Sequence, residues 1–323
     1  PGPVDSVRIN GILRFYHAPR SGLAVTRTLL PSMTERLFAE TWRITNVSDS
    51  TIKLNSGNVT FEQTQPGIYG QYRRTVHSDA PLEFLLQPGK SCSFSVYFSA
   101  YLDQEPDLNP DPDKILHDRQ TFLDNMKNQL VLTTPDPVLN MLFYFSKIRA
   151  AESIYATPMG LVHSPGGGRY YTGVWANDQA EYSGPFFPYL GYETGNTAAL
   201  NAYRVFLQNI PEGDGHFWSS FEMNGELTCC GADRGDAAMI AFGASHFAMA
   251  AGNKDIAVEL WPLIEWSLDY CERQKNEEGV IQSDSDEMEG RIPTGNANLS
   301  TSSLYYGCLL YTSPSPRDQL EHL

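Results

Sequence analysis

The feature that most constrains the fold is a change in hydrophobic periodicity at a Pro- and Asp-rich stretch, "DQEPDLNPDPDK", at residues 103–114. Before this stretch, apolar and polar residues alternate. In "CSFSVYFSAY" (92–101), Phe94, Val96 and Phe98 fall on one face of an extended chain and serines fall on the other. Alternation of this kind is typical of a half-buried β-strand. After the stretch, apolar residues recur at helical spacing, so a β domain followed by an α domain is expected.

Residues 1–102 are predicted to form an antiparallel β-sandwich. In "LFAETWRITNVSDSTIKL" (37–54), Phe38, Trp42 and Ile44 share one face of a strand, and a polar turn separates that strand from the next. Turn signals such as the Pro-Gly of "LQPGKS" recur about every ten residues, a spacing that favours a sandwich. Residues 103–115 are then a linker.

Residues 116–307 are predicted to form helical hairpins that carry long loops. Apolar residues have helical spacing in three segments: 136–156, 234–252 and 255–274. Pro262 is expected to bend or start the third helix. Three loops rich in Gly and aromatic residues separate the helices: 157–177, 210–233 and 276–298. Long loops in a compact domain usually carry function, so these three are the candidates for a binding site.

The net charge of −15 is concentrated in the second part of the chain, because residues 1–100 have a balance of +3 and residues 101–323 one of −18. Phosphate binding needs cationic partners, so this surface disfavours nucleic acid and anionic membranes as partners and suits a neutral substrate. The simpler explanation is that acidity aids solubility. No apolar run reaches the ~20 residues that a membrane helix needs.

Cysteine and histidine spacing gives no indication of a metal site or a cofactor. The five Cys form no Cys-x-x-Cys pair, and the seven His are scattered. We therefore expect no metal and no cofactor. Neither the oligomeric state nor the compartment follows from the sequence, and a bacterial cytoplasmic or a periplasmic or secreted location is equally open.

A crowded group of carboxylates occurs in "SDSDEMEGRIPTG" (283–295), which contains Asp284, Asp286, Glu287 and Glu289. One explanation is a solvated loop. The other is a site in which one carboxyl is kept protonated, because nearby like charge and partial burial raise a carboxyl pKa.

The stretch "PGGGRYYTGVWANDQAEY" (165–182) resembles the first barrel loop of six-hairpin, (α/α)6-toroid glycosidases. Trehalases of this group have a Pro-Gly-Gly-Arg-aromatic run, which Arg169 and the residues before it match with one extra Gly. Glucoamylases and glycogen-debranching enzymes have Trp-x-Arg-Asp, which Trp175 and Asp178 match, with Asn177 in place of Arg. The resemblance implies that Asp178 binds hydroxyls of the terminal sugar, Arg169 donates hydrogen bonds and Trp175 stacks. A glycine-rich loop pinned by a salt bridge and an aromatic plug is the alternative.

The same resemblance implies a role for the carboxylate group, because "GRIPTGNANLSTSSLYYG" (290–307) is similar to the polar stretch that follows the general-acid loop in these families. Glu287 then falls at the position of the acid, with Glu289 the second choice and Asp286 the third. Exposed loop acids remain the alternative explanation.

Two further segments contain candidate substrate-binding residues. "GADRGDAAM" (231–239) has the character of a helix start, with Asp233 as a candidate N-cap and Asp236 in the first turn. The Asp-Arg-Gly-Asp group (233–236) could also form part of the wall of a cleft. Trp218 in "DGHFWSSFE" is a candidate stacking platform for a sugar ring, and core packing explains it equally well.

The end of the chain, residues 308–323, includes "CLLYTSPSPRD", which resembles the translated adapter of a sequencing-library method found in metagenomic gene sequences. On this interpretation residues 116–307 supply about the first half of a toroid. The catalytic base of these families comes from the last hairpins, so the 323-residue chain is expected to be catalytically inactive.

The sequence therefore predicts an N-terminal β-sandwich joined to an incomplete (α/α)6 toroid, from a bacterial glycosidase. The expected parent activity is inverting hydrolysis of an α-linked, gluco-configured oligosaccharide. An inverting sugar phosphorylase is the main alternative, with a polysaccharide lyase behind it. A non-catalytic carbohydrate-binding scaffold is the alternative from another class, and it would not need Glu287.

Overall fold

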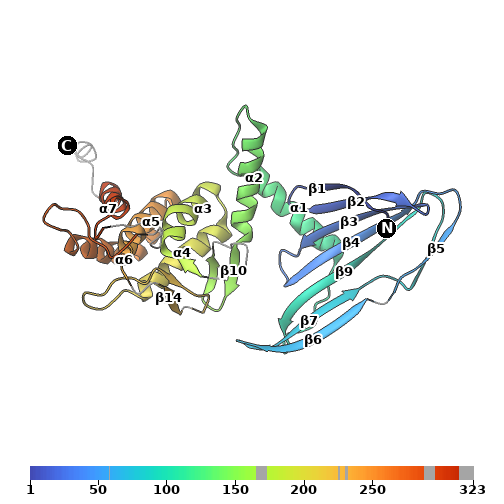
Figure 1. The fold of residues 1–323 in the computed structure, drawn as a ribbon, viewed down its shortest axis with the longest axis horizontal. Coiled ribbons are helices and arrows are strands. Elements are labelled where there is room, and N and C mark those ends of the chain that lie inside the picture. The colour runs from blue at the N-terminus through green and yellow to red at the C-terminus, as the bar shows by residue number, and fades with distance from the viewer. Residues whose placement is uncertain (58, 165–172, 225, 230–231, 287–294, 313–323) are drawn as a thin grey trace. The chain divides into compact units, whose positions relative to one another are not determined.

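The computed structural model describes residues 1–57, 59–164, 173–224, 226–229, 232–286 and 295–312 (Figure 1). The chain divides into two compact units, Pro1–Asn128 and Gln129–Leu323. The first unit is built mainly of strands and the second mainly of helices, which confirms the predicted fold class.

The first unit contains a seven-stranded antiparallel sheet in the order β1-β2-β3-β4-β9-β7-β6 and a two-stranded sheet, β5-β8. The strands are β1 Val4–Ile9, β2 Leu13–Arg20, β3 Leu23–Pro31, β4 Leu37–Asn46, β5 Ile52–Asn55, β6 Thr60–Gly67, β7 Gly70–Ser78, β8 Glu83–Leu86 and β9 Ser91–Leu102. In place of a sandwich of two large sheets, the structure has one large sheet and this two-stranded sheet. The two are in contact where the ring of Phe84 in β8 lies 5.9 Å from that of Phe94 in β9.

The more deeply buried face of β9 is the one that carries the polar residues. Ser95 and Tyr97 are 1% and 2% exposed, whereas Phe98 on the opposite face is 39% exposed. Asp79 makes this burial possible, because its carboxylate accepts hydrogen bonds from the Ser95 amide at 2.6 Å and from the Tyr97 hydroxyl at 3.0 Å. Alternation along β9 thus correctly predicted a strand, but apolarity alone did not identify its inner face.

Helix α1, Pro112–Asn128, packs on the sheet of the first unit rather than with the later helices. Its buried side chains include Phe122, Leu123 and Met126. The guanidinium of Arg119 donates two hydrogen bonds, of 3.0 and 2.8 Å, to the carbonyl of Gly11. The units therefore divide after Asn128, one helix later than the linker 103–115 that the sequence suggested, because an amphipathic helix covers a sheet as readily as it packs on another helix.

Among the described residues, the second unit contains helices and five short strands. The helices are α2 Pro137–Glu152, the π-helix η1 Asp178–Ser183, α3 Gly184–Leu190, α4 Glu193–Gln208, α5 Asp236–Ala251, α6 Lys254–Arg273 and α7 Leu299–Thr312. Strands β10 Ile154–Thr157 and β11 Gly160–His163 form a hairpin, and β12 Val174–Trp175, β13 Ser220–Phe221 and β14 Leu227–Cys229 form a small sheet. The segments predicted as helices match α2, α5 and α6. Pro262 lies inside α6 and does not start it.

The helices alternate between two rows. Helix α5 packs against α3, α6 and α7, and α4 packs against α3 and α6. Helices α3, α5 and α7 therefore make an inner row, with α4 and α6 as an outer row. Gly243 of α5 allows α5 and η1 to pack closely, since a Cβ at this position would lie 2.4 Å from the Cα of Ala180 in η1.

Connection lengths differ sharply between the two ends of these rows. The outer helices follow the inner ones after two-residue links, Gly191–Tyr192 and Gly252–Asn253. The return connections are the long segments 209–235 and 274–298. All long loops therefore open at the N-terminal ends of the inner helices, which locates the candidate site.

The close approach at Gly243 gives a prediction about stability. Replacing a helical glycine by alanine normally stabilises a helix by about 1 kcal/mol. Gly243→Ala should instead lower the free energy of unfolding by about 1–3 kcal/mol, because the new methyl group overlaps backbone atoms of η1. Urea denaturation followed by circular dichroism measures the change.

Gly295→Ala is the matched control, because a Cβ at Gly295 meets no atom within 4 Å. A Gly243→Ala variant as stable as this control would show that the inner row is not closely packed there.

Candidate active site

The three long loops of the second unit meet at two consecutive residues, Asp233 and Arg234. Arg234 is 3% exposed, and its guanidinium carbon lies 5.1 Å from the centre of the Trp175 ring, which belongs to the loop before η1. Its Nε donates a hydrogen bond of 3.4 Å to the carbonyl of Asp286, in the loop before α7. Arg234 therefore joins the loop that begins α5 to both neighbouring loops.

Asp233 makes a second set of links to the same segment. Its amide donates a 2.9 Å hydrogen bond to the carboxylate of Asp284, and its carbonyl accepts a 3.0 Å bond from the amide of Ser285. Its own carboxylate accepts a bond from the Gly235 amide at 2.8 Å and another from the Tyr270 hydroxyl of α6 at 2.8 Å.

The expectation that Asp233 caps α5 was wrong. The N-cap of α5 is Gly235, which has a φ of +84° and makes no side-chain cap. Glycine is required there because that backbone conformation is unfavourable for other residues. A Cβ would also lie 2.2 Å from the hydroxyl oxygen of Thr301 in α7. The carboxylate of Asp233 instead bridges the Gly235 amide, at the start of α5, and the Tyr270 hydroxyl of α6.

The loop before α7 is closed at its base. The Ser283 amide donates to the Asn296 carbonyl at 3.0 Å, and the Asn298 side-chain amide donates to the Ser283 hydroxyl at 2.9 Å and the Ser285 carbonyl at 3.3 Å. The side-chain oxygen of Asn298 accepts a 2.8 Å bond from the Thr301 amide in the first turn of α7. The two ends of the carboxylate-rich loop are thus held together. Glu287 and Glu289 themselves lie outside the described residues, as does Arg169.

Asp236 lies in the first turn of α5, as predicted, and is 1% exposed. Its carboxylate accepts a 2.7 Å hydrogen bond from the hydroxyl of Ser219. Burial raises the pKa of Asp236 to about 6, although the Ser219 bond and the charge of Arg234 act to lower it. Asp236 is therefore a buried carboxyl that keeps its proton to a higher pH than an ordinary aspartate.

The loop before η1 lies next to Ser219, because the Ala176 amide donates a 2.8 Å bond to the Ser219 carbonyl. Trp175 in β12 pairs with Ser220 in β13. Asn177 and Asp178, at the start of η1, are both half-buried. Of the residues singled out by the sequence, the structure therefore brings Trp175, Asp233 and Asp236 into one linked set, with Asn177 and Asp178 directly following it along the chain.

The sequence left two roles open for Trp218, sugar stacking and core packing. In the structure, the neighbouring residue Phe217 occupies the core position. Phe217 is 2% exposed and packs edge-on against Trp266 at 4.7 Å and Phe206 at 6.2 Å. Trp218 is 41% exposed and directly precedes Ser219. Core packing is thus supplied by Phe217, and the Trp218 ring is available at the surface for stacking.

Three residues of the linked set were not singled out by the sequence: Ser219, Tyr270 and Asn298. Arg234 belongs to the Asp-Arg-Gly-Asp group that the sequence offered as part of a cleft wall, and an arginine between two aspartates is well placed to bind carbonyls or carboxylates. Tyr270 lies at helical spacing in an apolar segment and has the pattern of a core residue. Among the described residues, no group of three or more His, Cys, Asp or Glu is placed to bind a metal ion.

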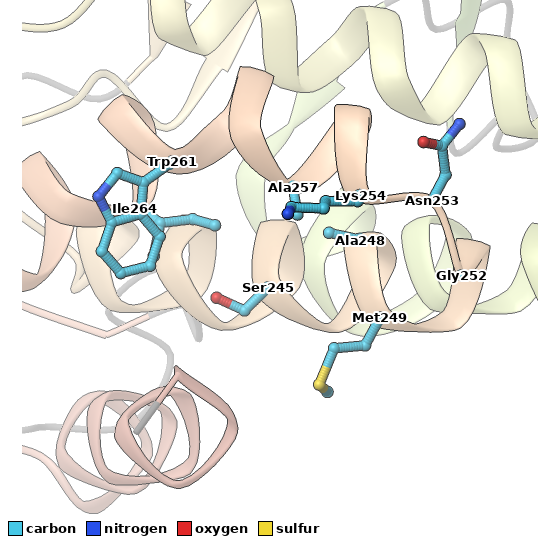
Figure 2. Close-up of a pocket in the computed structure, with 9 residues that line it drawn as sticks. All are labelled: Ser245, Ala248, Met249, Gly252, Asn253, Lys254, Ala257, Trp261 and Ile264. Atoms are coloured by element: carbon cyan, nitrogen blue, oxygen red, sulfur yellow. The ribbon is translucent and has the colours of Figure 1, made fainter. Parts of the chain in front are cut away.

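A groove lies away from these loops. It has a volume of about 360 Å³ and lies between α5 and α6, close to their two-residue link; Figure 2 shows the residues that line it. Its lining includes Met249, Gly252 and Trp261, with Lys254 as the charged residue. It is at the opposite end of the inner row from Asp233 and contains no carboxylate, so we do not assign it to the active site.

No protein-family model matches the chain, and no curated protein sequence matches it. Solved structures do resemble it. A proposed kojibiose phosphorylase from the human microbiome is 10% identical and has a TM-score of 0.61; the match covers 94% of this chain and 50% of that protein. A bacterial glucoamylase complexed with acarbose is 11% identical with a TM-score of 0.45, covering 82% of this chain and 49% of that one. The phosphorylase-like protein shares the fold, and this chain spans about half of its length.

The raised pKa of Asp236 predicts a dependence of stability on pH. Its value of about 6 exceeds the ~3.9 of an aspartate in an unfolded chain. The folded chain therefore holds the extra proton between these values, and the free energy of unfolding falls as the pH rises through this window. Asp236→Asn removes that loss, so the variant should gain up to about 3 kcal/mol relative to the parent between about pH 4 and 7.

Urea denaturation of both proteins across this pH range measures the difference. A stability difference that does not change with pH would contradict the assignment of a raised pKa to Asp236.

Proposed function

We propose that the chain is part of a carbohydrate-active enzyme that cleaves an α-linked, gluco-configured glycoside with inversion. The observation that carries the proposal is the docking of residues 284–286 on Asp233 and Arg234, because it brings the carboxylate-rich loop to the loop of Trp175. The shared fold with a proposed kojibiose phosphorylase supports the same class of enzyme.

In this proposal the sugar is bound by the residues around β12 and η1. Asp178 and Asn177 accept and donate hydrogen bonds to sugar hydroxyls, and Arg169 adds donors. Trp175 and the exposed ring of Trp218 pack on the apolar faces of sugar rings.

Glu287 is the proposed general acid, with Glu289 as the second candidate. Its neighbours Asp284 and Asp286 add negative charge, which favours the protonated form that an acid needs at neutral pH. Inverting enzymes hold their two carboxyl groups ~6.5–9.5 Å apart, so that a water fits between the base and the sugar. We place the base outside the described residues.

Phosphorolysis is the second candidate reaction, favoured by the 0.61 TM-score of the match to a proposed phosphorylase. Phosphate would then replace water as the nucleophile, and a cationic site would be needed to bind it. Release of a sugar 1-phosphate rather than free sugar identifies this reaction. A carbohydrate-binding scaffold without activity is the third possibility, in which Glu287 has no role.

Saccharide binding is the first test. Asp178→Asn in the 323-residue chain should weaken the binding of kojibiose or maltose by about tenfold or more, because hydrogen bonds to a charged group contribute about 1.5–3 kcal/mol. Isothermal titration calorimetry measures the affinity. Trp261→Ala is the control, since Trp261 is 45% exposed and lines the groove at the other end of the helices. Equal losses in both variants would argue against a sugar site near Asp178.

Glu287→Gln tests the acid. In a polypeptide that joins this chain to the helices completing the toroid, the variant should lower kcat on a natural disaccharide by about 10²–10⁴-fold, the usual contribution of a general acid. An aryl glycoside with a good leaving group needs no proton and should be affected less. Unchanged turnover of the disaccharide would remove Glu287 from this role and transfer it to Glu289.

A further inference from the structure

We propose that Tyr270 is a positioning residue of the active site: through Asp233 it fixes the segment Ser283–Asp286, here called the acid segment, at the base of the carboxylate-rich loop. The effect of Tyr270 on catalysis rests on the proposed function. The hydrogen bonds that join Tyr270 to the acid segment are a property of the folded chain and are tested separately.

Tyr270 is itself held rigidly. It lies in α6, is 5% exposed, and its ring stacks on that of Trp266 with a centroid distance of 5.5 Å and an interplanar angle of 13°. The guanidinium carbon of Arg273 lies 5.8 Å from its ring centre. Its hydroxyl donates to Asp233 Oδ2 at 2.8 Å. Burial, followed by the charge of Asp233, raises the pKa of Tyr270 well above its ordinary value, so the hydroxyl remains a donor at any working pH.

Asp233 connects the rigidly held Tyr270 to the acid segment. One carboxylate oxygen is bound by Tyr270 and the other by the Gly235 amide, so the orientation of the side chain is fixed by α6 and by the start of α5. With the side chain fixed, the backbone amide and carbonyl of Asp233 point at Asp284 and Ser285. Two of the hydrogen bonds that hold the acid segment therefore depend on the orientation of Asp233, in addition to those made with Asn296, Asn298 and Arg234.

The groups around Asp233 are poorly suited to replace the hydrogen bond that the Tyr270 hydroxyl donates to it. Asp236 and Asp284 act on this region as negative charges, and Arg234 is the nearby cation, already packed on Trp175 and bonded to Asp286. A carboxylate that is 6% exposed and loses a donor has to rotate or admit water, because an unsatisfied buried acceptor is costly. The side chain is then no longer fixed by α6, and we expect the amide and carbonyl that hold the acid segment to become more mobile.

Tyr270→Phe in the 323-residue chain tests the inference directly. Hydrogen exchange of the Ser285 and Asp233 amides should accelerate by about tenfold or more, since both of their hydrogen bonds depend on the orientation of Asp233. Amides in the middle of α5, such as that of Ala244, report whether the helices remain folded.

Tyr305→Phe is the matched control. The Tyr305 hydroxyl also donates to a carboxylate, that of Glu272 in α6, and among the described residues no hydrogen bond or ring contact joins it to the acid segment. The control should leave exchange at Ser285 and Asp233 unchanged. Equal exchange in Tyr270→Phe and the control, with α5 intact, overturns the inference. If Tyr270→Phe does not fold, Asp233→Asn replaces it. The amide keeps a carbonyl acceptor but loses the charge, so exchange at Ser285 should still rise, and unchanged exchange is again the overturning result.

The effect of Tyr270 on catalysis is tested in a polypeptide with the completed toroid. Tyr270→Phe should lower kcat at least tenfold, leave KM within about twofold and shift the limb of the pH profile that reports the acid. Faster exchange at Ser285 with unchanged kcat and pH profile overturns the positioning role. A parent polypeptide with no turnover overturns the proposed function instead, and the exchange measurements then still decide whether Tyr270 fixes the acid segment.

Discussion

The buried residue Asp233 is the point on which the rest of the candidate site depends. Its amide, carbonyl and both carboxylate oxygens are hydrogen-bonded, to the acid segment, to the start of α5 and to Tyr270 of α6. Because buried polar groups are costly to leave without partners, these elements cannot move independently of one another. Arg234 extends the same link to Trp175, so three loops that are far apart in the sequence form one constellation.

The helical frame explains why these loops meet. Two-residue links force consecutive helices to run antiparallel, and the left-handed conformation of Gly191 and Gly252 ends α3 and α5 abruptly. The short links occupy one end of the helix rows, so the long segments open at the other. Gly243 brings η1 against α5 and thereby brings the loop of Trp175 toward the loop of Asp233. Packing of the inner helices and assembly of the site are thus parts of one arrangement.

Periodicity predicted several of the elements but not their contacts. The alternation in β9 and the helical spacing in α2, α5 and α6 were visible in the sequence, because local burial patterns determine them. The placement of α1 on the sheet was not visible, since an amphipathic helix does not specify its partner. The inner face of β9 was also missed, because Asp79, in the segment between β7 and β8, satisfies the polar groups of Ser95 and Tyr97.

The candidate site was predictable to a similar degree. Asp236 was correctly placed in the first turn of α5, and Asp233 was correctly grouped with it but wrongly assigned as a cap. The role of Gly235 depends on the position of Thr301 in α7, which no local pattern reveals. Tyr270 is indistinguishable from a core tyrosine until its hydroxyl is seen to reach Asp233. Long-range hydrogen bonds therefore account for most of what the sequence could not supply.

The central claim is that the loops joined by Asp233 and Arg234 form a single saccharide site. Chemical-shift mapping of the 323-residue chain during titration with maltose or kojibiose tests this most directly. We predict shifts at the indole groups of Trp175 and Trp218 and at the amides of Asp178 and Ser285, with none at Trp261. Shifts confined to the Trp261 groove, or no shifts at saturating disaccharide, would contradict the account.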